Sequence, residues 1–335
     1  MWEELELMLL LSKEDIKHVF SMKDTIESVK RSFMLYSEGK TENPLRTKIK
    51  VSKFDGTLLV MPTYAEGTDY ASLKIINIYP KNIDKGIPTS FAQVILIDAR
   101  TGDIVAALDG TYVTQLRTGA ASGACFDALG RKDAKIGALI GTGGQAATQL
   151  EAMMSVRKLE LVKVYDYSSE RINKFVNIMS KELNEYNTKI VAAHSADEAV
   201  EDADLLITVT PSKKPVFDAL KCKAGVTVSC VGSYQPDMQE MDPQILTRAD
   251  KIYFDSKSSV LEESGDIIIP LNNGIITEND FTGELGEVLS ERIKGRENDE
   301  EIIVFKTVGI GIQDLVTAKD IYEKSVAASI GTNWN

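Results

Sequence analysis

Short apolar runs, bounded by glycine or by polar residues, recur through the middle of the chain. Polar stretches with the composition of helices separate several of these runs. Strands that alternate with helices are typical of a doubly wound parallel sheet. The pattern therefore predicts an α/β domain in the middle of the chain. The apolar runs cover residues 136–140, 159–166, 189–193, 204–210, 226–231 and 251–255.

The first 130 residues follow a different pattern. Ser12 followed by Asp15 predicts a helix start, and an amphipathic helix is expected over 22–38, ending at Gly39. Apolar and polar residues then alternate, and Asp55-Gly56 is a strong hairpin signal. We expect an antiparallel sheet with helices on one side. Its strands are predicted at residues 46–51, 57–61, 71–79, 90–98 and 104–108.

A glycine-spaced turn follows the first apolar run of the middle region. Gly141, Gly143 and Ala146 fit the G-x-G-x-x-G/A spacing, in which a dinucleotide pyrophosphate binds the N-terminus of the next helix. The following run ends at Asp166, about 20 residues on, where a carboxylate can bind the adenosine ribose. This acid favours NAD. Arg171 lies a few residues later and could soften that preference, so NADP remains an alternative cofactor. The motif predicts a Rossmann domain, and a structural glycine turn in another α/β domain is the alternative.

Composition excludes several classes of protein. The net charge is −12 without a basic block, which argues against a nucleic-acid partner. The two histidines, His18 and His194, lack the spacing of metal ligands. The opening residues 1–6 are acidic where a signal peptide is basic, and the apolar run 7–11 is too short to span a membrane. Three cysteines, an odd number, suit a reducing compartment, so we expect a cytoplasmic protein.

Two further helices complete the predicted organisation. Residues 116–129 are rich in Ala, Gly and Ser, which suits a connecting helix packed closely between domains. Residues 313–328 are again helical and are expected to return to the first domain. A small sheet with one uncovered face tends to find a partner, so we expect a homodimer through the first domain.

Residues 117–122 (RTGAAS), taken with the turn 141–146 (GTGGQA), resemble the ornithine cyclodeaminase/mu-crystallin family. The resemblance implies a substrate-binding and dimerisation domain over 1–117 and 313–335, with a Rossmann dinucleotide-binding domain over 118–312. It implies NAD(H) or NADP(H) as the cofactor and chemistry at the Cα–N bond of an amino or imino acid. Further matches lie at residues 9–16, 44–46, 61–62, 73–74, 98–102, 231–240 and 305–314.

The resemblance also assigns residues to the site. Arg46, Lys74 and Arg117 take the positions of a clamp for the substrate carboxylate, which guanidinium groups grip through both oxygens. Lys74 and Arg117 are catalytic candidates as well, and Thr307 and Val308 match a stretch that approaches substrate and nicotinamide. The family holds its dinucleotide at the positions of Thr89, Arg117, Gly141, Gly143, Gly144, Gln145, Ala146, Asp166, Thr210, Val231 and Gly232. For Thr210, a strand-end threonine that satisfies local backbone is an equal alternative.

The chain departs from the cyclodeaminases of this family at two positions. They carry an acid three residues before the Met-Pro pair, to hold the distal amine of the substrate, and here that residue is Leu59. They also carry an aspartate after the glycine pair of the late Rossmann strand, and here Tyr234 takes that place. A tyrosine is a poor base at neutral pH but can donate a proton. Leucine cannot hold an ammonium group.

Three functions are compatible with these residues. We expect an NAD(P)-dependent oxidoreductase that reduces a cyclic or open 2-imino acid, because this reaction needs no distal acid. Ornithine cyclodeaminase is the second hypothesis, and the two departures count against it. A mu-crystallin-like binding protein without necessary turnover is the third hypothesis. It ranks last, because Arg46, Lys74 and Arg117 together are more than storage of a dinucleotide requires.

Overall fold

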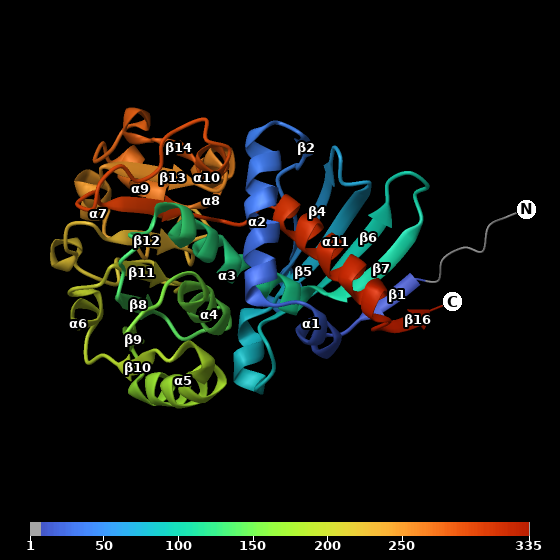
Figure 1. Cartoon of the computed structure of the whole chain (residues 1–335), viewed down its shortest axis with the longest axis horizontal. Helices are drawn as coiled ribbons and strands as arrows, with labels where there is room; N and C mark the ends of the chain where they lie inside the picture. Colours follow the sequence, from blue (N-terminus) through green and yellow to red (C-terminus); the bar gives the residue numbers. More distant parts are fainter. Residues whose placement is uncertain (1–7, 335) are drawn as a thin grey trace, which may run out of the picture. The chain divides into compact units, whose positions relative to one another are not determined.

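The computed structural model describes residues 8–334, which form two compact units (Figure 1). Unit 1 contains the chain up to Arg117 and from Ile310 onward, and unit 2 contains Thr118–Gly309. The acidic opening residues 1–6, and the first residue of the apolar run 7–11, lie outside the described part of the chain.

Unit 1 is a sheet with helices packed on one face. Its strands are ordered β16-β1-β7-β6-β5-β4-β2, and β3 pairs with β4. Helix α11 packs on α2 and on β4, β5 and β6, and Figure 1 shows both helices on the same side of the sheet. The elements are β1 (Met8–Leu11), α1 (Lys13–Val19), α2 (Met22–Ser37), β2 (Thr41–Glu42), β3 (Thr47–Val51), η1 (Ser52–Phe54), β4 (Gly56–Ala65), β5 (Tyr70–Ile78), η2 (Pro80–Lys85), β6 (Ser90–Asp98), β7 (Ile104–Asp109), α11 (Gly311–Ala328) and β16 (Thr332–Trp334).

The local signals at the start of the chain are confirmed. Ser12 accepts a hydrogen bond of 3.2 Å from the backbone N–H of Asp15, and the Asp15 carboxylate bonds back to Ser12, which together cap α1. Helix α2 ends just before Gly39, whose φ of +69° lies in the left-handed region. The five predicted strands are present as β3 to β7.

The sheet of unit 1 is mixed, not purely antiparallel as expected. Strand β1 pairs in parallel with β7, and β16 pairs with the other side of β1. Strand β1 is a run of four apolar residues, and periodicity alone cannot tell such a run from a buried helix segment. Pairing with two partners that are distant in sequence makes it a strand.

Unit 2 contains a parallel sheet in the order β10-β9-β8-β11-β12-β15-β13-β14. The first five strands run in the Rossmann order 3-2-1-4-5, so the predicted doubly wound fold is confirmed. Every residue of β11, β12 and β15 is buried. The elements are β8 (Ile136–Ile140), α4 (Ala146–Val156), β9 (Leu161–Tyr165), α5 (Ser169–Glu182), η3 (Asn184–Tyr186), β10 (Lys189–Ala192), α6 (Ala196–Val200), β11 (Leu205–Thr208), η4 (Ala219–Lys221), β12 (Thr227–Cys230), α7 (Pro243–Arg248), β13 (Lys251–Phe254), α8 (Lys257–Glu263), α9 (Gly265–Asn272), η5 (Glu278–Asp280), β14 (Gly283–Glu284), α10 (Leu285–Leu289) and β15 (Ile303–Lys306).

Helix α3 (Gly110–Leu129) begins at Gly110, earlier than the predicted start at 116, and carries the chain from unit 1 into unit 2. Its small residues allow close packing within unit 2. A methyl group added at Gly119 would overlap the backbone carbonyl of Thr148 on α4. The Gln149 side chain also donates to the carbonyl of Thr118 at 2.9 Å.

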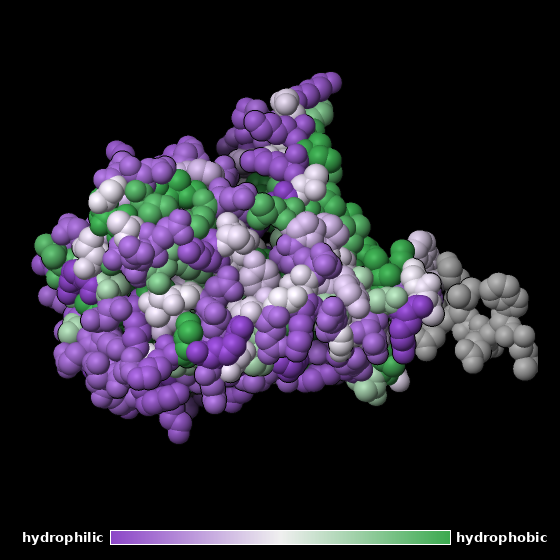
Figure 2. Space-filling view, turned by 90° about the horizontal axis from the view of Figure 1, so that it is seen from above, coloured by the Kyte–Doolittle hydropathy of each residue, from purple (hydrophilic) through white to green (hydrophobic). Residues whose placement is uncertain are grey.

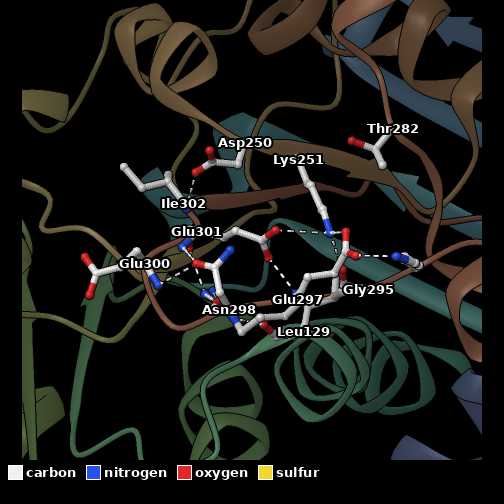
Figure 3. Close-up of polar contacts among 12 residues, drawn as sticks. Leu129, Asp250, Lys251, Thr282, Gly295, Glu297, Asn298, Glu300, Glu301 and Ile302 are labelled. Atoms are coloured by element: carbon white, nitrogen blue, oxygen red, sulfur yellow. Dashed lines mark hydrogen bonds and ion pairs between the residues drawn. The ribbon is translucent and has the colours of Figure 1, made fainter.

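Strand β15 lies between β12 and β13 and is absent from the predicted strands, although residues 302–305 form a short apolar run. A charged stretch precedes it, and Figure 3 shows how that stretch is held at the amino ends of the strands. The Lys251 ammonium lies 2.8 Å from a Glu297 carboxylate oxygen and 3.2 Å from one of Glu301. Asp250 accepts a 2.8 Å hydrogen bond from the backbone of Ile302. This network stabilises a loop at the edge opposite the carboxyl ends of the strands.

Among residues 8–334, no helix is both long enough and apolar enough to cross a membrane.

Candidate active site

The glycine turn of unit 2 has the geometry that a pyrophosphate needs. Gly141 has a φ of +107°, and a Cβ atom there would lie 2.6 Å from the carbonyl oxygen of Val209. Added Cβ atoms at Gly143 and Gly144 would meet nothing within 4 Å, so the backbone is open to an approaching group. Helix α4 begins at Ala146, which is fully buried. The positive end of the helix dipole suits an anion at this turn, so the residues fit a dinucleotide.

Asp166 follows β9 and lies against the glycine turn. One of its oxygens accepts hydrogen bonds from the backbone N–H and the hydroxyl of Thr142, at 3.0 and 2.7 Å. The other oxygen accepts from the backbone of Ser168 at 3.2 Å. The Arg171 guanidinium lies 3.4 Å from the carboxylate. Asp166 is therefore fixed beside the turn, and Arg171 is paired with it.

The remaining dinucleotide candidates of unit 2 lie at the carboxyl ends of strands. Thr210 follows β11, and Val231 and Gly232 follow β12, which pairs in parallel with β11. The carboxyl ends of parallel strands are the usual ligand-binding edge of such a sheet. Gln145 directly precedes α4 at the same edge.

The segment after β15 is held by a buried carboxylate that the sequence did not indicate. Asp255 accepts a hydrogen bond from the Thr307 hydroxyl at 2.6 Å and from the backbone N–H groups of Val308 and Gly309 at 3.0 and 2.7 Å. Burial raises the pKa of Asp255, whereas these donors lower it. The candidate substrate residues Thr307 and Val308 thus have a fixed backbone.

Unit 1 brings together two of the three clamp candidates on one carboxylate. The Lys74 ammonium donates to Asp314 at 2.5 Å, and the Arg117 guanidinium donates to the other Asp314 oxygen at 3.1 Å. All three side chains are buried, with Lys74 and Asp314 each 1% exposed. Lys74 is on β5, Arg117 on α3 and Asp314 on α11, so three elements build this cluster.

The environment of Lys74 lowers its pKa to about 7. Burial is the largest cause, because a charged ammonium loses its hydration, and the neighbouring Arg117 charge adds to the effect. The Asp314 carboxylate raises the pKa of Lys74, whereas the Arg46 charge lowers it, as the Arg117 charge does. Two guanidinium groups and one carboxylate therefore act on this lysine.

The sequence motifs do not single out Asp314 or Gln313 as site residues. Gln313 accepts a hydrogen bond from Arg117 at 3.3 Å and one from the backbone of Ile310 at 3.0 Å. Both are fully buried polar residues within an apolar stretch of α11. Such a polar pair flanked by Ile312 and Leu315 is the signal that could have revealed them.

The other candidates fall in both units. Leu59 is buried on β4, on the same face as Met61, which pairs directly with Lys74. Thr89 is exposed in unit 1, just before β6, and its carbonyl accepts from Tyr79 at 2.7 Å. Tyr234 belongs to unit 2 and is half-buried.

Comparison with known proteins identifies the same family over nearly the whole chain. Residues 6–329 match the model of the ornithine cyclodeaminase/mu-crystallin family. A Δ1-pyrroline-2-carboxylate reductase of Bacillus cereus is 35% identical over 97% of this chain and 98% of its own. The structure of Thermococcus litoralis Δ1-pyrroline-2-carboxylate reductase in complex with NADH and L-proline is 42% identical with a TM-score of 0.92, covering 98% of this chain and 100% of that one. An archaeal alanine dehydrogenase dimer with bound NAD is 35% identical with a TM-score of 0.89, covering 98% and 99%.

The Rossmann sheet, the glycine turn and these relatives define the class of protein, an NAD(P)-dependent oxidoreductase that acts at the Cα–N bond of an amino or imino acid. The chain belongs to the ornithine cyclodeaminase/mu-crystallin family.

Proposed function

We propose that this chain reduces Δ1-pyrroline-2-carboxylate, a cyclic 2-imino acid, to L-proline with NADH. The observation that carries the proposal is the buried cluster of Lys74, Arg117 and Asp314. When Lys74 is protonated, the cluster holds two cations against one anion, and buried charge is costly unless it is balanced. A substrate carboxylate supplies the missing negative charge.

The residues of the chain have separate tasks in this reaction. Lys74 and Arg117 hold the carboxylate, which fixes the orientation of the neighbouring imine carbon. Asp314 keeps both cations in place. The Tyr234 hydroxyl is our candidate for the group that donates a proton to the ring nitrogen. The glycine turn and Asp166 hold NADH, which supplies the hydride when bound. Leu59 gives the buried face beside Lys74 an apolar character that suits a compact ring.

Similarity to reductases of known substrate supports the same choice. The relatives named Δ1-pyrroline-2-carboxylate reductase cover nearly all of this chain, and one of their structures contains both NADH and L-proline. The cyclic imino acid has no distal amine. Its reduction therefore does not need the two acids that cyclodeaminases carry at the positions of Leu59 and Tyr234.

The decisive experiment measures oxidation of NADH and of NADPH with a panel of imino acids. The panel contains Δ1-pyrroline-2-carboxylate, its six-membered analogue, and pyruvate with ammonia. We expect kcat/KM to be highest for the five-membered ring with NADH, and the product to be L-proline. Absence of turnover with both cyclic substrates would overturn the proposal.

Alanine dehydrogenase is the second candidate, favoured by the 35% identity to the archaeal enzyme over nearly the full length of both chains. In that reaction the clamp of Lys74 and Arg117 would hold the carboxylate of an open-chain substrate. Pyruvate with ammonia separates the two candidates, because an alanine dehydrogenase consumes NADH with it and forms L-alanine.

We also propose that the chain works as a homodimer through the sheet of unit 1. The face opposite Lys74 carries a row across four strands, formed by Ile49, Leu58, Asn77 and Phe91. Ile49 and Phe91 are 49% and 48% exposed. Figure 2 shows a band of hydrophobic surface at the right of the view, over unit 1. Apolar patches on a sheet face are typical of protein interfaces, and the archaeal alanine dehydrogenase is described as a dimer.

Sedimentation tests the dimer. The unmodified protein is expected to have twice the mass of the chain, and Phe91→Lys on the exposed sheet face should shift it toward the monomer. Val326→Lys is the matched control, because Val326 is 55% exposed on α11, which packs on the other face. An unmodified protein that is monomeric at micromolar concentration would contradict this assignment.

A further inference from the structure

Three acidic or basic side chains lie completely buried in unit 2, outside the glycine motif. Glu240, Asp266 and Lys306 are each 0% exposed. Burying a charge is strongly unfavourable unless it is paired and hydrogen-bonded. Their contacts show what this arrangement does for the sheet.

Glu240 joins the carboxyl ends of two neighbouring strands. One carboxylate oxygen accepts from the backbone N–H and the hydroxyl of Thr210, at 2.6 and 3.0 Å. The other accepts from the backbone N–H groups of Val231 and Gly232, at 3.1 and 2.5 Å. Three of the four partners are N–H groups that can only donate, so both carboxylate oxygens must act as acceptors at these strand ends. The two strand ends it joins are those assigned to the dinucleotide.

The two strand ends are packed too closely for a side chain at Gly232. A Cβ atom at Gly232 would lie 2.6 Å from a Glu240 carboxylate oxygen and closer still to the backbone of Thr210. The segment after β12 therefore passes directly against the segment after β11, with the Glu240 carboxylate between their N–H groups.

Asp266 and Lys306 hold Glu240 itself. One Asp266 oxygen accepts from the backbone N–H groups of Glu240 and Met241, at 2.8 and 2.9 Å. The other oxygen lies 3.0 Å from the Lys306 ammonium. Lys306 is the last residue of β15, directly before Thr307. The network thus connects the ends of β11, β12 and β15, three strands that follow one another in the sheet.

We propose that Glu240 is a positioning residue, whose carboxylate holds Thr210, Val231 and Gly232 in the shape that receives the dinucleotide. It does not itself contact the reacting atoms. The inference rests on the proposed NAD(H) site, and it predicts that changes at Glu240 reach cofactor affinity through the backbone of the two strand ends.

The same sheet offers a matched control at its other edge. Asp204 accepts hydrogen bonds from the backbone N–H groups of Lys135 and Ile136, at 2.7 and 2.9 Å, at the amino end of β8. It is 6% exposed and performs the same kind of strand-end capping, away from the dinucleotide candidates. Glu240→Gln and Asp204→Asn therefore both replace a buried carboxylate by an amide, and only Glu240→Gln disturbs the strand ends assigned to the cofactor.

The experiment measures the Kd of NADH by its fluorescence, together with Tm, for the unmodified protein and both variants. We expect both variants to lower Tm, and Glu240→Gln alone to weaken NADH about tenfold or more, the effect of losing hydrogen bonds to a charged group. Equal NADH affinity in the two variants would overturn the positioning role. Failure of the unmodified protein to bind NADH would instead contradict the proposed function.

A second variant covers the case in which Glu240→Gln does not fold. Glu240→Asp keeps the buried negative charge opposite Lys306, but its shorter side chain cannot reach both strand ends. It is expected to fold and still to bind NADH more weakly than Asp204→Asn does. NADH affinity equal to that of the unmodified protein would overturn the inference.

Discussion

Lys74 and Asp314 are 240 positions apart in the chain, and their side chains form a 2.5 Å ion pair that is almost completely buried. The lysine lies on a central strand of the unit 1 sheet and the aspartate on the helix that follows the return from unit 2. The N-terminal and C-terminal parts of the chain therefore build this cluster together. Its cations and its counter-ion determine how the proposed substrate clamp should respond to pH and to substitution.

The activity should depend on the protonation of Lys74. Its pKa is lowered to about 7, so the clamp carries the lysine charge below pH 7 and loses it as the pH rises through this value. We expect kcat/KM for the imino acid to fall above about pH 7. The decrease in kcat should lie at higher pH, because the carboxylate of the bound substrate stabilises the charged Lys74 ammonium and raises its pKa. Lys74→Arg keeps its charge throughout this range, so it should remove the alkaline limb. A limb that persists unchanged in this variant would rule out Lys74 as its source.

Arg117 should matter for turnover more than for folding. Arg117→Ala leaves the substrate carboxylate poorly paired in a buried site, and we expect kcat/KM to fall by a factor of about 100 or more. Arg157 is a matched control, because it is also buried but donates to backbone carbonyls of Phe126 and Gly130 at 2.6 and 2.9 Å. Arg157→Ala should lower Tm and leave kcat/KM of the folded protein nearly unchanged. Similar losses of kcat/KM in both variants would argue against the clamp.

Asp166 should set the preference between the two nicotinamide cofactors. Its carboxylate is fixed by Thr142 and would repel a 2′-phosphate. Asp166→Ala should therefore weaken NADH and reduce the discrimination against NADPH, as measured by the Kd of each cofactor. Stronger binding of NADPH than of NADH to the unmodified protein would show that the assignment of Asp166 to the ribose is wrong.

The chain should be a poor ornithine cyclodeaminase. Cyclisation needs a group that holds and deprotonates the distal amine, and the buried Leu59 makes an unpaired ammonium unfavourable. An exposed alternative acid, Asp237, is engaged by Lys213 at 2.6 Å. Incubation with ornithine and NAD should give almost no proline and ammonia compared with the reductive reaction. Proline formation at a rate close to that of imine reduction would contradict this, and Tyr234→Phe would then show whether Tyr234 takes part.

The sequence by itself determined the features that depend on neighbours along the chain. The spacing of Gly141, Gly143 and Ala146 after an apolar strand predicted the Rossmann fold, because a tight turn and a helix start are local geometry. The caps of α1 and α2 and the hairpin at Asp55-Gly56 were predictable for the same reason. Family resemblance then placed Lys74 and Arg117, although it could not say what lies beside them.

Tertiary structure alone decided which buried charges meet. Asp314, Asp255 and Glu240 each have partners far along the chain or in another element, and no periodicity marks them in the sequence. Strands β1 and β15 are short apolar runs in the sequence, and only the folded chain decides which strands they pair with. Hydrogen bonds and ion pairs between distant segments form only when packing brings those segments together, so their identity is a property of the folded chain.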